Sequence, residues 1–182
     1  MGKHLIAERY ADTLAYVEKT CRSLDSVSVA LRCDDPYLAL LILEIALERF
    51  ESRPWERIRN SNDCMILGET ESVKIDDVRG VFHFAAMKGS DCSRKYLVFH
   101  RLDELNVYAE NGLLKLFEEP PSRSCVFATV SSWERLLPTV RSRILKIEAP
   151  VRLHEATRFD AVPPEWRWIS KRNAGFALAM LK

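Results

Sequence analysis

Short apolar runs alternate with helical patterns along most of this chain, and that alternation is the feature that most restricts its fold. Five runs have the length and the β-branched or aromatic content of strands: 27–31, 64–67, 95–100, 124–130 and 144–149. Patterns of helical period lie between and before them: 4–20, 36–50, 75–89 and 107–119. Apolar strands that alternate with helices favour a parallel sheet covered on both faces. The sequence therefore predicts an α/β fold with a five-stranded parallel sheet and helices on both faces.

The pattern also makes local predictions. The segment 51–63 is polar and is expected to be irregular. In 75–89 the predicted buried stripe consists of Ile75, Val78, Phe82 and Ala86. In 107–119, Leu113, Leu114 and Phe117 share a helical face, so Phe117 is expected to anchor this helix on the sheet while the glutamates at 118 and 119 stay accessible.

The composition is that of an ordinary globular chain. With 182 residues, of which 47% are hydrophobic and 29% charged, the chain can build one compact domain and a small appendage. A formal net charge of +1 gives no overall field that would favour nucleic acid or a membrane surface. The longest apolar run, 38–45, is too short to span a bilayer, and the first residues have no apolar signal core, so we expect a cytoplasmic protein.

The cysteines show no pattern of metal ligation or disulfide pairing. There are five of them, an odd number, and none belongs to a C-x-x-C pair. Cysteines without such spacing usually behave as small buried hydrophobes. We therefore predict free thiols and no metal site.

The turn between the first strand and the helix at 36–50 reads RCDDPY. A phosphate-binding loop needs glycines that turn backbone N–H groups toward the phosphates, together with a lysine and a hydroxyl. This turn has none of these and places Cys33, Asp34 and Asp35 there instead. Asp35 is a good N-cap and Pro36 suits the first helical position. The turn predicts a well-capped helix, and its two carboxylates would repel a triphosphate.

Two glutamates stand at the end of the helix at 107–119, where the helix dipole disfavours negative charge. Such a departure from a local rule can mark a functional position. The alternative is that Glu118 and Glu119 are two solvated carboxylates before the stop at Pro120 and Pro121.

Two arginines flank Ser142 just before the last strand. Exposed arginines commonly form surface ion pairs of little energetic value. An arginine held at the rim of a sheet can instead reach a phosphate on a neighbouring molecule. Both interpretations of Arg141 and Arg143 are open at this point.

These stretches together resemble a known family. The run N-x-L-L-K-x-x-E-E-P-P, the strand with Ala-Thr and the segment LLPTVRSR resemble the AAA+ domain of bacterial DNA polymerase III clamp-loader subunits, the delta-prime family most of all. The matching positions are Asn111, Lys115, Glu118, Glu119, Pro120, Pro121, Thr129, Ser142 and Arg143. The match is strong over 73–148, weaker from 27, and faint at 170–181.

The resemblance implies an architecture. It predicts a degenerate AAA+, P-loop-NTPase-like core over 1–149 and a truncated, lid-like helical segment over 150–182, without the family's collar domain. Family members often carry a four-cysteine zinc module, but 51–63 contains no cysteine, so no zinc is expected.

The resemblance also implies roles for single residues. Ser142 and Arg143 match the family's serine–arginine pair, which presents an arginine finger to ATP bound by the adjacent subunit. Arg141, which precedes this pair, is a further candidate at the same place. Thr129, with Ser131 nearby, falls where the family has a polar sensor residue, although without nucleotide these side chains are expected to cap local backbone.

Several family elements that handle nucleotide are replaced. The family's Mg²⁺-binding strand ends in Asp-Glu, and the corresponding positions are His100 and Arg101, which are not hard oxygen ligands. The pair Asp103 and Glu104 follows too late in the chain. The arginine of the lid aligns with Gly175. We therefore expect a nucleotide-binding fold that has lost its nucleotide chemistry, with no cofactor and no ATPase activity of its own.

The expected function is that of a non-hydrolysing clamp-loader subunit. Its expected partners are gamma/tau-like ATPase subunits and delta-like subunits, with at most weak or indirect contact with DNA and none with a membrane. One alternative is a nucleic-acid-binding or scaffold module, whose candidate residues are Arg135, Arg141, Arg143 and Lys146. The other alternative is an ATPase with an unconventional phosphate site.

Overall fold

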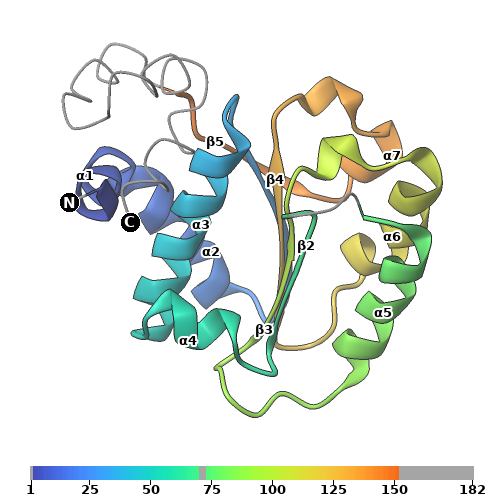
Figure 1. Cartoon of the computed structure of the whole chain (residues 1–182), viewed down its shortest axis with the longest axis horizontal. Helices are drawn as coiled ribbons and strands as arrows, with labels where there is room; N and C mark the ends of the chain where they lie inside the picture. The colour runs from blue at the N-terminus through green and yellow to red at the C-terminus, as the bar shows by residue number, and fades with distance from the viewer. Residues whose placement is uncertain (1, 70–72, 152–182) are drawn as a thin grey trace.

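The computed structural model describes residues 2–69 and 73–151, which form an α/β fold around one parallel sheet (Figure 1). The sheet has five strands in the order β2-β3-β4-β1-β5, and all neighbouring pairs are parallel. This confirms the predicted sheet. The strands are β1 (Val27–Arg32), β2 (Cys64–Leu67), β3 (Lys95–Phe99), β4 (Ser124–Val130) and β5 (Leu145–Glu148).

Helices cover both faces of the sheet, as Figure 1 shows. One face carries α1 (Gly2–Arg9), α2 (Ala11–Ser23), α3 (Pro36–Glu51) and α4 (Trp55–Arg59). The other carries α5 (Ile75–Ala86), α6 (Val107–Glu118) and α7 (Pro138–Arg141). Two short 3₁₀ turns, η1 (Leu102–Glu104) and η2 (Trp133–Arg135), follow β3 and β4. Each face has its own hydrophobic cluster.

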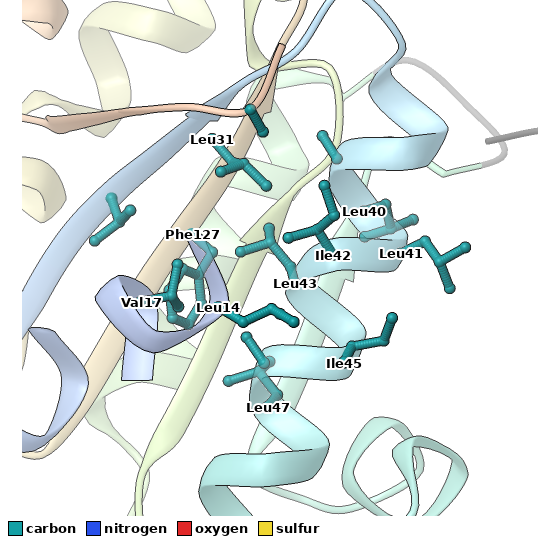
Figure 2. Packing of buried hydrophobic residues seen from close by; sticks show 14 of the residues in the cluster. Leu14, Val17, Leu31, Leu40, Leu41, Ile42, Leu43, Ile45, Leu47 and Phe127 are labelled. Carbon is teal, nitrogen blue, oxygen red and sulfur yellow. The ribbon is translucent and has the colours of Figure 1, made fainter. Parts of the chain in front are cut away.

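Helix α3 is the most deeply buried element. All residues from Leu38 to Leu47 are buried, because the helix packs between the sheet and α1, α2 and α4. Figure 2 shows side chains of α3 facing Leu14 and Val17 of α2 and the strand residues Leu31 and Phe127. Glu44 is the one charged residue in this stretch, and Lys3 lies 3.9 Å from its carboxylate. The position of this helix also determines where its N-terminus meets the sheet.

Three local predictions are corrected. The helix expected at 4–20 is two helices, broken at Tyr10, whose buried side chain donates a hydrogen bond to the Pro150 carbonyl.

The segment 51–63, expected to be irregular, contains α4, which buries Trp55 and Ile58. In α5 the buried stripe includes Val78, Val81 and Phe84, whereas the predicted Phe82 and Ala86 are exposed.

Helix α6 is anchored to the sheet through Phe117, as expected. Phe117 is 2% exposed, and its ring meets that of Phe99 edge to face at 5.9 Å between centroids. The Phe117 carbonyl also accepts a hydrogen bond from Ser28 Oγ of β1. Leu113 and Leu116 are buried beside it, while Glu118 and Glu119 are exposed.

Replacing Phe117 with alanine should lower the free energy of unfolding by about 3–5 kcal/mol, because a large ring leaves a cavity between α6 and the sheet. Chemical denaturation measures the loss. Tyr108→Ala in the same helix is the matched control, since Tyr108 is 80% exposed, and it should change stability by less than about 0.5 kcal/mol. A loss below about 1 kcal/mol for Phe117→Ala would place the core face elsewhere.

Candidate functional site

The candidate site lies at the carboxyl ends of β1, β3 and β4. Ligands of open parallel sheets bind at this edge. Leu31 pairs with Thr129 and Phe99 pairs with Ala128, so these strands end close together. The Cys33 N–H donates to the Val130 carbonyl at 2.9 Å, which holds the turn after β1 against β4. The turn at 33–35 and the residues after β3 are thereby brought together.

Asp35 closes the N-terminus of α3 with its own side chain. Its Oδ1 accepts hydrogen bonds from the backbone N–H of Tyr37 at 3.0 Å and of Leu38 at 3.1 Å. Asp35 is 2% exposed, so this contact is internal. The first N–H groups of a helix form a natural anion site. Here that site is taken by a carboxylate of the chain itself.

The other residues of the turn are also engaged within the chain. Asp34 is exposed and forms an ion pair with Arg32 at 2.7 Å, and Arg32 Nη1 lies 3.9 Å from Glu148. Burial raises the pKa of the Cys33 thiol to about 12, so this thiol is not a nucleophile at neutral pH. The turn therefore presents acidic charge and no reactive group.

His100 lies just after β3 and is fully buried. Its Nδ1 lies 2.9 Å from Thr129 Oγ1, and its ring centroid lies 5.2 Å from that of Tyr37. The Thr129 hydroxyl also accepts the backbone N–H of Arg101 at 2.9 Å. Thr129 and His100 thus join the ends of β3 and β4. No partner for His100 Nε2 lies in the described part of the chain.

Arg101 adopts a left-handed backbone with φ of 57°, which turns the chain sharply after His100. Its Nη2 donates to the Gly68 carbonyl at 2.9 Å, and its Nη1 lies 3.4 Å from Glu104. The guanidinium therefore ties the end of β2 to the turn after β3, and Glu104 is used in an ion pair.

Two buried carboxylates, whose roles the sequence did not indicate, hold the segment that leads to Arg143. Asp103 accepts the N–H groups of Ser131 and Ser132 at 3.1 and 2.9 Å. Glu110 accepts the Leu137 N–H at 2.9 Å, and burial raises its pKa. These bonds fasten the loop 131–137 to η1 and to α6. The one signal in the sequence for Glu110 was its position near the start of a helix. Acidic residues are common at that position, so the signal was not specific.

Arg143 and Glu118, which are separate parts of the sequence motif, lie in contact. Arg143 Nε donates to Glu118 Oε2 at 3.2 Å, and Nη1 donates to the Thr139 carbonyl at 3.0 Å and to Ser142 Oγ at 3.2 Å. Both belong to the α6–α7 side of the sheet, whereas Asp35 starts α3 on the other side (Figure 1). The rim arginine and the turn after β1 are therefore two distinct places in this fold.

The remaining motif residues surround α6. The Asn111 side chain donates to the Val107 carbonyl of its own helix, and Lys115 is exposed. Pro120 and Pro121 are half-buried and lead into β4.

The basic residues of the nucleic-acid alternative differ in their surroundings. Arg135 is exposed and Arg141 is half-buried. Lys146 pairs with Glu148 and lies over the Trp133 ring at 5.0 Å.

Residues 2–69 and 73–151 contain neither a candidate metal site nor a membrane-spanning helix. No group of three or more His, Cys, Asp or Glu side chains in these residues could hold a metal ion. In the same residues no helix has the length and apolar character needed to cross a bilayer. The expected lid segment, including Gly175, lies outside the described residues apart from 150 and 151. The division at residue 149 and the absence of zinc stay predictions.

Comparison with known proteins decides the family. The sequence model described as DNA polymerase III, delta subunit, matches residues 51–151, more than half of the chain. The chain belongs to the DNA polymerase III delta subunit family. The delta-prime subunit of DNA polymerase III from Pseudomonas aeruginosa is 30% identical over 79 residues, which are 43% of this chain. The expected resemblance to delta-prime subunits is thus confirmed.

Solved structures confirm the AAA+ P-loop type of fold. A DNA polymerase III gamma subunit-related protein from Thermotoga maritima has a TM-score of 0.77 at 22% identity, over 91% of this chain and 56% of that one. The Bacillus subtilis DNA clamp loader delta protein has a TM-score of 0.51 at 13% identity, over 80% of this chain and 44% of that one. The chain spans about a quarter, 24%, of the curated delta-prime relative.

The buried imidazole should make this family member acid-sensitive. Burial, and secondarily the charge of Arg101, lower the pKa of His100 from 6.5 to about 4, against a weaker opposite effect of Asp103. Between these values the unfolded chain binds more protons than the folded one. The stabilisation is complete above about pH 6.5 and is lost as the pH falls toward about 4. Its full size is about 3 kcal/mol.

Denaturation of the wild type between about pH 7 and about pH 5 should show a loss of about 2 kcal/mol from this group. His100→Gln keeps a polar side chain that does not titrate, so its stability should fall less over the same range. Equal pH dependence in the two proteins would mean that His100 is not held neutral by the fold.

Proposed function

We propose that this chain is a non-hydrolysing clamp-loader subunit of the delta-prime type, which binds ATPase subunits and takes part in loading the sliding clamp during DNA replication. The observation that carries the proposal is the Asp35 carboxylate on the N–H groups of Tyr37 and Leu38. These are the N–H groups that a bound phosphate would need.

The position of a metal-binding acidic pair supports the same proposal. It is filled by His100, which is buried against Thr129, and by Arg101, which donates to the Gly68 carbonyl. Neither side chain is an oxygen ligand of the kind that Mg²⁺ prefers. Asp103 uses both carboxylate oxygens on backbone N–H groups. An ATPase with an unconventional phosphate site therefore has little support in this geometry.

The second part of the proposal is that Arg143 acts on a partner's nucleotide. Its guanidinium is about one-third exposed, with a side-chain relative exposure of 32%, and it lies on the α6–α7 side of the sheet. An arginine that reaches across an interface acts mainly on the charge that develops in phosphoryl transfer. Gamma/tau-like ATPase subunits and delta-like subunits are the proposed partners. A direct DNA-binding role has less support, because Arg143 and Lys146 each pair with a glutamate.

The test replaces Arg143 with alanine in a complex that contains one true ATPase subunit next to this chain. Hydrolysis at that subunit should fall by a factor of about 10³ or more, because the transition state loses its counter-charge. Arg143→Lys should restore little of the hydrolysis rate, since the lysine ammonium lacks the planar, forked set of donors of a guanidinium. Steady-state ATP turnover per assembled complex is the measurement, with assembly followed on the same samples.

Arg79→Ala is the matched control, because it removes the same charge from an exposed arginine of α5 that pairs with Asp76. It should leave turnover unchanged. If Arg143→Ala weakens folding or assembly and leaves turnover per complex normal, Arg143 is a structural ion-pair residue and the chain is a scaffold.

A further inference from the structure

The contact between Glu118 and Arg143 joins the end of α6 to the turn between α7 and β5, 25 residues later in the sequence. Glu118 is the last residue of α6, where the helix dipole disfavours a carboxylate. The acid is therefore poorly placed for its own helix, and Arg143 supplies the positive charge that offsets this.

The geometry of the contact leaves one edge of the guanidinium open. Glu118 accepts the hydrogen bond from Nε, while the Thr139 carbonyl and Ser142 Oγ accept hydrogen bonds from Nη1. No partner of Nη2 lies among the described residues. A guanidinium has five donors in a rigid plane. Fixing Nε and Nη1 therefore orients the two N–H groups of Nη2 without using them.

Glu118 follows a residue that is anchored in the core. The preceding residue, Phe117, is 2% exposed, and its carbonyl is held by Ser28 Oγ at 3.1 Å. Arg143 in turn follows a loop that Asp103 and Glu110 fasten by backbone hydrogen bonds. The Glu118 carboxylate is itself 57% exposed at its side chain, so it lies at the surface and does not serve the core.

We propose that Glu118 is a positioning residue for Arg143: it holds the guanidinium through Nε so that the Nη2 edge faces the phosphate of a nucleotide bound by the adjacent subunit. This inference rests on the proposed arginine-finger function. The carboxylate touches neither nucleotide nor metal. Its contribution is to remove, before the subunits meet, the rotational freedom that a long arginine side chain would otherwise lose in the transition state.

The experiment compares Glu118→Ala, Arg143→Ala and the double variant in the complex with one ATPase subunit. Glu118→Ala should lower kcat about tenfold and leave KM for ATP and subunit assembly unchanged, because positioning acts in the transition state. Glu118→Gln keeps an oxygen that can accept a hydrogen bond from Nε but loses the negative charge. Its kcat should therefore lie between that of Glu118→Ala and that of the wild type. Glu134→Ala removes an exposed acid of η2 and should have no effect.

The double variant separates positioning from a general structural role. If Glu118 acts only through Arg143, adding Glu118→Ala to Arg143→Ala lowers kcat no further. A further loss in the double variant, or weakened assembly, would overturn the inference, as would a rise in kcat, which would mean that Glu118 competes with the phosphate.

The two proposals fail in different ways. If Arg143→Ala lowers turnover and Glu118→Ala does not, the positioning role is wrong and the arginine finger stands. If Arg143→Ala itself leaves turnover unchanged, the arginine finger is wrong and the positioning role falls with it.

Discussion

The N-terminus of α3 is the constraint around which this domain is arranged. The helix is buried along ten successive residues from Leu38 to Leu47, so its first N–H groups cannot be left without acceptors. In a nucleotide-binding relative of this architecture a phosphate can satisfy them. Here the Asp35 side chain accepts the N–H groups of Tyr37 and Leu38 from inside the chain. This contact is the basis of the proposal that the fold does not depend on a bound nucleotide.

The same device recurs in the other loops of the sheet. The Asp63 carboxylate accepts N–H groups of Ser90 and Cys92, and although burial alone would raise its pKa, these bonds and those from Asp91 lower it. Asp103 and Glu110 similarly hold the loop 131–137. Asp63 and its partners precede β2 and β3, whereas the loop 131–137 follows β4, so internal carboxylates hold loops at both edges of the sheet. A residue that acts across an interface needs a well-held frame of this kind.

Periodicity was sufficient to predict the sheet and the long helices, because α3, α6 and the five strands follow the burial pattern of a two-faced parallel sheet. Periodicity failed where contacts between residues far apart in the sequence determine the local structure. Tyr10, where the first helix breaks, is buried and donates a hydrogen bond to the Pro150 carbonyl, 140 residues away, and no local pattern shows that contact. In α5, the period alone did not show that Phe84 and not Phe82 faces the sheet.

The residues of the candidate site could be found from the sequence, but the contacts between their side chains could not. The acidic turn at 33–35, His100 and Arg101 after β3, and the Ser142–Arg143 pair are all visible in the sequence. Spacing could not show that Arg143 rests on Glu118, since that contact depends on how α6 and α7 pack. It also could not show that both carboxylate oxygens of Asp103 accept backbone N–H groups, from Ser131 and Ser132.

The most direct test of this account is calorimetric titration of the isolated chain with ATP and Mg²⁺. No saturable binding is expected, because Asp35 occupies the N–H groups at the start of α3, Asp34 adds negative charge beside them, and His100 offers no oxygen ligand to the metal. A dissociation constant in the micromolar range would contradict it and would show that this fold has kept its nucleotide site.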